Sequence, residues 1–222
     1  MKKSRILFIS YFSAIGLFLI GFTIMGFVYS DKSSDDFKRN HYVEISEDLA
    51  SFKHIYVDKN CDVNIKSSEQ AYFSYAHKKG EKTIKPVFRV RNDTLYVEHT
   101  DKRITIYFAR LQSISGNHCE IRLKSTDLDQ LSIHLKRANL RIWDNVNIAK
   151  LKVDLEESSN VSGWNFKTKQ LVLDIDNSEF NVNSNVKLEL AKGTIRNNSS
   201  ICISPAKSIQ LELDESSQLQ IH

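Results

Sequence analysis

The chain has 222 residues, of which 41% are hydrophobic and 10% aromatic, and this composition excludes a disordered protein. Its three cysteines are too few for a small domain built on disulfides. The formal net charge is +4, but Lys2, Lys3 and Arg5 supply three of these charges, which leaves 28 basic against 27 acidic residues. This balance argues against a nucleic-acid partner, because nucleic-acid-binding proteins usually carry a marked basic excess.

The N-terminus carries a candidate membrane segment. Residues 6–29 contain no charged residue, and about 20 apolar residues are enough to cross a bilayer as a helix. A cleavable signal peptide has a shorter apolar region of about 7 to 15 residues, so an uncleaved signal anchor is favoured. Cleavage stays open as the alternative, because Val28 and Ser30 form a weak cleavage site. We therefore expect one transmembrane helix, preceded by a cytoplasmic tail of residues 1–5.

The charges that flank this segment predict its orientation. Basic residues precede it and Asp31, Asp35 and Asp36 follow it, so the positive-inside rule keeps the N-terminus in the cytoplasm. Residues 30–44 are polar and lack periodicity, which is typical of a tether. The rest of the chain is expected outside the cytoplasm.

Apolar and polar residues alternate in the first part of the remaining chain, and this pattern predicts short strands with one buried face. A loop is expected over residues 76–86, which include Gly80 and Pro86. Residues 111–123 are interpreted as an irregular first coil, since Leu111 stands one repeat before Leu131. The expected strands are residues 52–57, 61–65, 72–75, 87–90, 95–97 and 104–108.

A sequence repeat with a nearly constant period fills the C-terminal half. Similar apolar pairs begin at Leu131, Leu151, Leu171 and Ile209, and a weaker copy begins at Ala191. A second apolar pair follows each of them, for example Leu140 with Ile142 and Phe180 with Val182, and runs of Ser, Asn and Asp that indicate turns lie between the pairs. Such a unit cannot bury its apolar face alone, so successive units must stack. The pattern predicts an all-β fold, a single-stranded parallel β-helix (β-solenoid) with coils of about 20 residues, over residues 45–222.

Several segments resemble the head GIN domain family of auto-transporter adhesins in bacterial envelopes. They are residues 52–57 (FKHIYV), 61–65 (CDVNI), 92–97 (NDTLYV) and 111–116 (LQSISG), together with the regular coils that follow. The resemblance covers about residues 45–222 and implies a β-solenoid with an adhesin-like role. This sequence departs from the family pattern in having few glycines in its turns and a transmembrane anchor in place of a lipoprotein signal. With the predicted anchor, the implied location is a bacterial inner membrane, with the solenoid in the periplasm or outside the cell.

Cysteine and histidine give no metal or cofactor signal. Cys61 and Cys119 fall on the inward phase of their strands and Cys202 on the outward phase, so buried free thiols are favoured over a disulfide. The seven histidines lack metal-ligand spacing. Neither a nucleotide-binding loop nor a nucleophile elbow is present in the sequence. We therefore expect no metal and no cofactor.

Two groups of residues are candidate binding sites. The first is aromatic: Trp143 and Trp164 are separated by about one repeat and could be neighbours on adjacent coils. Packing at a coil corner is the favoured interpretation, and stacking on sugar rings is the alternative.

The second group is acidic. Asp154, Glu156, Asp174 and Asp176 fall on the outward phase of successive coils and should converge. Such a row could bind a hard cation such as Ca²⁺ or act on a glycosidic bond, but a solvated face moderated by Lys136, Lys152 and Arg196 is favoured.

These observations predict a membrane-anchored binding or structural module of a bacterial cell envelope, whose partners are the membrane, through residues 6–29, and an envelope glycan or protein. We expect no enzymatic activity. The alternative is a polysaccharide lyase or hydrolase on a β-helix scaffold, but an enzyme needs long loops that enclose its substrate, and the turns here are short. The sequence does not determine the oligomeric state.

Overall fold

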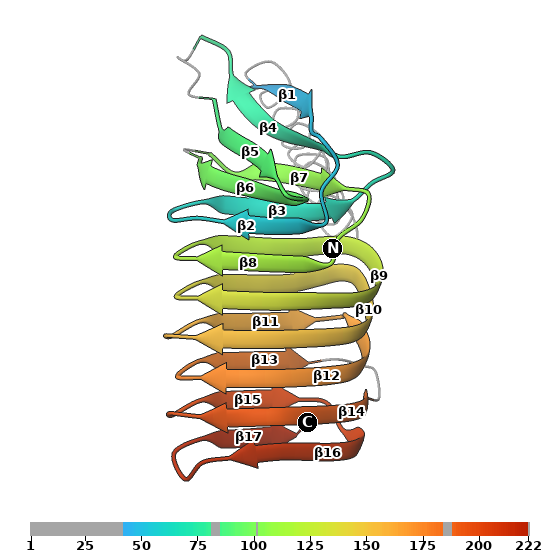
Figure 1. The fold of residues 1–222 in the computed structure, drawn as a ribbon, viewed down its shortest axis with the longest axis vertical. Coiled ribbons are helices and arrows are strands. Elements are labelled where there is room, and N and C mark those ends of the chain that lie inside the picture. The colour runs from blue at the N-terminus through green and yellow to red at the C-terminus, as the bar shows by residue number, and fades with distance from the viewer. Residues whose placement is uncertain (1–41, 81–84, 101, 184–187, 222) are drawn as a thin grey trace, which may run out of the picture. The chain divides into compact units, whose positions relative to one another are not determined.

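The computed structural model describes residues 42–80, 85–100, 102–183 and 188–221. The chain divides into two compact units, residues 1–43 with 77–81 and residues 44–76 with 82–222, and the second unit holds the solenoid (Figure 1). All regular elements of the described residues are β-strands. None of these residues belongs to a helix that could cross a membrane. The predicted cytoplasmic tail and transmembrane helix lie outside the described residues.

Regular coils follow β8 (Ser113–Asn117) and stack in parallel with nearly constant register. Leu131, Leu151, Leu171, Ala191 and Ile209 lie above one another, which confirms the predicted β-solenoid and its coil length. The strands are β9 (Glu120–Lys136), β10 (Asn139–Glu156), β11 (Asn160–Trp164), β12 (Lys167–Asp176), β13 (Glu179–Asn183), β14 (Leu188–Arg196), β15 (Ser200–Ile203), β16 (Ala206–Leu213) and β17 (Gln218–Ile221).

Two sheet surfaces run along these coils. The first face consists of β8, the C-terminal parts of β9 and β10, and then β12, β14 and β16. The second face consists of the N-terminal parts of β9 and β10, and then β11, β13, β15 and β17. β9 and β10 were expected as pairs of short strands, but each continues around the corner between the faces. Their pairing continues there, with Val146 next to Thr126 and Ile148 next to Leu128.

The first coils are arranged differently from the prediction. β2 (His54–Val57) lies between β6 (Thr94–His99) and β8, and β3 (Asp62–Ser67) lies between β7 (Ile104–Phe108) and β9. The coil that begins at Leu111 is therefore not the first coil, since two coils precede it. Of these two coils, the one formed by β6 and β7 comes later in the sequence but lies farther from the regular coils than the one formed by β2 and β3.

Antiparallel strands cover the outer side of this end (Figure 1). β4 (Tyr72–Lys78) pairs with β7, and β5 (Val87–Arg91) pairs with β6. The expected loop over residues 76–86 thus begins later, since β4 runs to Lys78. β1 (Tyr42–Asp48) is a strand that begins inside the predicted tether.

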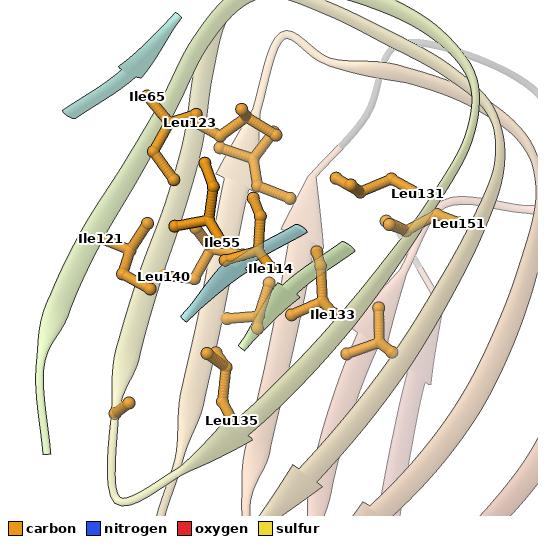
Figure 2. Packing of buried hydrophobic residues seen from close by; sticks show 14 of the residues in the cluster. Ile55, Ile65, Ile114, Ile121, Leu123, Leu131, Ile133, Leu135, Leu140 and Leu151 are labelled. Carbon is orange, nitrogen blue, oxygen red and sulfur yellow. The ribbon is translucent and has the colours of Figure 1, made fainter. Parts of the chain in front are cut away.

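The interior is formed by apolar side chains from both faces. Figure 2 shows Ile121 and Leu123 of the second face and Ile133 and Leu135 of the first lining the same interior, and all four side chains are buried. Stacking adjacent coils buries each apolar row against the next, which is the main driving force for this fold.

The cysteines lie as predicted, since Cys61 and Cys119 are buried, Cys202 is half-buried, and all three are free thiols. Burial raises the pKa of the Cys119 thiol to about 12. A buried thiol that stays protonated packs as a small apolar group. No disulfide is needed to explain these positions.

One corner is built from left-handed turn residues and a stack of buried serines. The residues with positive φ angles at this corner are not glycines, so the chain changes direction there without glycine. They are His118, Arg137, Glu157, Ser158, Asn177, Asn197 and Asn198. Ser178 accepts a hydrogen bond from the Ser159 backbone N–H at 3.1 Å and donates one to the Asp176 carbonyl at 2.8 Å. Ser199 accepts one from the Ser178 N–H at 3.3 Å. The buried turn backbone is thereby satisfied from coil to coil.

Gly193 lies in a strand of this solenoid, at a position that only glycine can occupy. Its φ is +141°, and an added Cβ would lie 1.7 Å from the Leu173 carbonyl oxygen. Gly116 and Gly163 are also strand residues. None of the three glycines of the regular coils lies in a turn. Other residues, among them asparagines and a serine, therefore adopt the positive φ angles of the turns.

Candidate functional site

The four predicted acidic residues do come together on the first face. Asp154 pairs in register with Asp174, and Asp176 lies beside Arg196 of the next coil. Glu156 follows Asp154 on the same strand and the same side, and the side chains of all four acids are partly exposed. The outward phase expected from the sequence is therefore confirmed.

Arg196 neutralises two of these carboxylates. Its Nη1 donates to Asp174 Oδ1 at 2.8 Å and its Nε donates to Asp176 Oδ2 at 3.0 Å. Asp176 also accepts a hydrogen bond from the Asn197 side chain at 2.7 Å, and these bonds from Asn197 and Arg196 hold the pKa of Asp176 below its ordinary value. Both acids are thus occupied by hydrogen-bond partners of the chain itself.

The other two acids also face basic groups. His134 Nδ1 lies 3.1 Å from Asp154 Oδ2, and Lys136 Nζ lies 4.0 Å from Glu156. Lys136 also binds Glu157 at 2.6 Å, and this hydrogen bond holds the pKa of Glu157 below its ordinary value. The row is a ladder of carboxylates with basic side chains beside them, as the favoured interpretation of a moderated, solvated face expects.

A metal ion would have one place to bind along this ladder. His134, Asp154 and Glu156 each offer a ligand atom, and these atoms lie within 4.8 Å of one another. One imidazole nitrogen with two carboxylates suits zinc-like ions better than Ca²⁺, which prefers oxygen ligands only. We assign no metal to this group, because His134 already binds Asp154 and Lys136 faces Glu156.

The two tryptophans meet on the outer side of the second face. Their ring centroids lie 5.8 Å apart and the rings are nearly perpendicular at 88°. Lys124 of the preceding coil lies 4.1 Å above the ring of Trp143, within range of a cation–π interaction. We call Lys124, Trp143 and Trp164 the aromatic corner. The predicted packing of the tryptophans on adjacent coils is confirmed.

One ring of this corner stays accessible. Asp144 and Asn145 adopt positive φ angles inside β10, where the register with β9 shifts between Trp143 and Val146, and Asn165 does so just after the end of β11. Trp164 is 50% exposed, whereas Trp143 is half-buried and its indole N–H is buried without a hydrogen-bond partner in the described part of the chain. The corner thus presents one open ring that a second ring holds in place.

Sequence reasoning missed two features of these surfaces. The first is Lys124, which pairs in register with Trp143 from one coil away, so the repeat itself could have identified it.

The other is a cleft of about 520 Å³ near the covered end of the solenoid. An ion pair between Lys53 and Asp93, 2.8 Å apart, lies at this cleft, and its hydrogen bond lowers the pKa of Asp93. No local pattern indicated it, since the lining comes from segments far apart in sequence; it includes Leu49, Phe52, Lys53, Ala71, Asp93 and Arg110.

Comparisons with known proteins show the fold. No protein-family model matches the chain, and neither does any curated protein. Among solved structures, it is similar to a putative adhesin from Parabacteroides distasonis, with 14% identity and a TM-score of 0.57 over 81% of this chain and 93% of that one. A putative adhesin from Bacteroides fragilis is also similar, with 13% identity and a TM-score of 0.58 over 82% of this chain and 97% of that one. The chain shares its β-solenoid fold with these proteins.

Four of the described carboxylates have lowered pKa values. A general acid needs a raised pKa in order to hold its proton near neutral pH. Where a carboxyl pKa is shifted here, the shift is downward, as at Asp93, Glu157, Asp176 and Asp214. These four groups are suited to ion pairing and hydrogen bonding.

Proposed function

We propose that this chain is an adhesin-like binding module of a bacterial envelope, of the head GIN type. It shares the β-solenoid fold of two putative adhesins over most of its length. Its two faces carry partly exposed polar and aromatic side chains on rigid strands. Such a scaffold supports binding by presenting side chains at fixed spacing, about 4.8 Å from coil to coil.

The ligand of this module is an envelope glycan that contacts the aromatic corner. The observation that carries this proposal is the half-exposed ring of Trp164, which is held edge to face by Trp143. A fixed tryptophan offers a large apolar surface to the face of a sugar ring and loses little conformational entropy on binding. The neighbouring Lys124 and the positive-φ residues Asn145 and Asn165 supply polar groups for the hydroxyls.

Membrane attachment through residues 6–29 completes the proposal. The module would then stand on the outer side of the inner membrane, with the N-terminus in the cytoplasm. Protease added to spheroplasts should digest a C-terminal epitope and spare an N-terminal one. A C-terminal epitope that stays protected in intact spheroplasts and is cleaved after lysis would contradict this orientation.

A glycan array probed with the purified full chain, kept in mild detergent, tests the binding function. We expect binding to a subset of bacterial glycans, and loss of that binding in Trp164→Ala. Val87→Ala is the matched control, because Val87 is a comparably exposed apolar residue (47%) on β5, at a different part of the solenoid. Equal binding by Trp164→Ala and wild type would refute the aromatic corner as the site. Absence of any glycan binding would refute the glycan ligand itself.

A further inference from the structure

The last coil of the described residues, formed by β16 and β17, has exposed apolar side chains of the inward phase. Apolar residues of the inward phase are buried in the coils above it, as are Leu171 and Ile175 of β12. In the last coil the residues of the same rows are exposed: Ile209 to 38% and Leu213 to 37%. Ile221 of β17 is exposed to 48%. Water therefore contacts the end of both apolar sheets.

The backbone of this end is also unpartnered along one edge. Within the described residues, β16 pairs only with β14, and β17 pairs only with β15. Their outer edges present N–H and C=O groups that another strand could bind, and an apolar edge of this kind is a strong site for pairing. We call β16 and β17 the terminal edge.

The terminal edge is complementary to a second copy of itself. When two copies of β16 run antiparallel with Leu211 facing its equivalent, Ile209 of one copy lies opposite Leu213 of the other. All three residues have the inward phase, so the apolar rows continue from one copy into the next. This register keeps the core continuous without moving any strand.

The charges at the two ends of β16 favour the same arrangement. Lys207 lies near the start of the strand, and Asp214 and Glu215 follow its end. Antiparallel pairing brings the basic start of one copy to the acidic end of the other, twice per pair. A parallel pairing would instead place like charges together.

We propose that two copies of this chain associate through their terminal edges, end to end about a two-fold axis. The opposite end of the solenoid is covered by β4 and β5, which run antiparallel to the strands below them. The covered end therefore differs from the terminal edge in strand direction, and we expect the terminal edge to pair with its own copy. An interface of this kind closes after two copies and does not form filaments.

Light scattering coupled to size-exclusion chromatography of the full chain tests this proposal. Wild type should be a dimer at micromolar concentration. Lys207→Glu and Glu215→Lys should each weaken the dimer at least tenfold, and combining them should restore it, because the charges are then exchanged. Ile209→Lys should give a monomer, whereas Val87→Lys, at the covered end, should leave the dimer intact.

Several outcomes would overturn the proposal. One is a wild-type monomer at the highest accessible concentration, and another is assembly into open-ended oligomers. A dimer that tolerates Ile209→Lys would place the interface elsewhere, for example in the N-terminal segment. Failure of the exchanged-charge variant to recover would contradict the antiparallel register. None of these outcomes bears on glycan binding, which depends on a different face.

Discussion

Replacing Leu173 by aspartate should destabilise the solenoid far more than the same change at its neighbour Val172. Leu173 is 1% exposed in the interior, where it lies in register between Val153 and Gly193. Val172 precedes it on the same strand, points to the outer face and is half-buried. The two substitutions therefore introduce the same charge at adjacent positions on opposite sides of the sheet.

The expected magnitudes differ several-fold. Truncating a buried leucine costs about 2 to 5 kcal/mol, and an unpaired carboxylate in its place adds several kcal/mol more. Leu173→Asp should thus remove about 5 kcal/mol or more, which is comparable to the whole stability of a typical domain. Val172→Asp should cost about 1 kcal/mol, as outer-face changes usually do. At about 2 to 4 °C per kcal/mol, Leu173→Asp should lower the Tm by at least about 10 °C and Val172→Asp by a few degrees.

Thermal melts followed by far-ultraviolet circular dichroism measure both variants. Because each coil contacts only its neighbours, hydrogen exchange should also show that Leu173→Asp loses protection first in β12 and the coils after it. Equal melting temperatures for the two variants would refute the assignment of inward and outward phases. Uniform loss of protection from β2 to β17 would refute the coil-by-coil account of stability.

Two further predictions concern the turns. Ser178→Ala should lower the free energy of unfolding by about 1 to 3 kcal/mol in urea denaturation, because it leaves the buried N–H of Ser159 without an acceptor. Ser158→Ala, on the exposed side of the turn, should have little effect. Equal losses in the two variants would contradict the role of the buried serines. The pKa of Asp214 lies at about 2, chiefly because its carboxylate accepts a hydrogen bond from the Asn197 backbone N–H. Its contribution to stability is therefore present above about pH 4 and is lost as the pH falls towards 2. Asp214→Asn should flatten the plot of unfolding free energy against pH across this window, and an unchanged plot would contradict this role of Asp214.

Much of the regular solenoid could be predicted from the sequence because stacking translates a constant repeat period directly into register. The alternation of Leu171, Leu173 and Ile175 fixes the inward side of one strand, and its copies fix the others. The same reasoning placed Asp154 and Asp174 side by side. It could not show that Arg196 bridges two acids, since that depends on the reach and direction of a long side chain.

The first coils could not be predicted from the local pattern. β2 and β6 each have the pattern of a short alternating strand, and nothing in either indicates that the later strand lies outside the earlier one. The exposure of Trp164 was also open, because aromatic residues occur both inside and at the surface. The pairing of β9 with β10 on both sides of the bulge after Trp143 depends on contacts with adjacent coils and leaves little local signal.

Glycan binding by wild type and Trp164→Ala, measured side by side by surface plasmon resonance on the best glycan from the array, tests the central claim most directly. If the exposed ring is a main contact, its loss should cost about 2 kcal/mol, which raises the Kd about 30-fold. Trp164→Tyr should recover part of the affinity, because it restores an aromatic face. Circular dichroism melts of both variants should match wild type, since the replaced ring is half exposed. A Kd that is unchanged in Trp164→Ala would contradict the account.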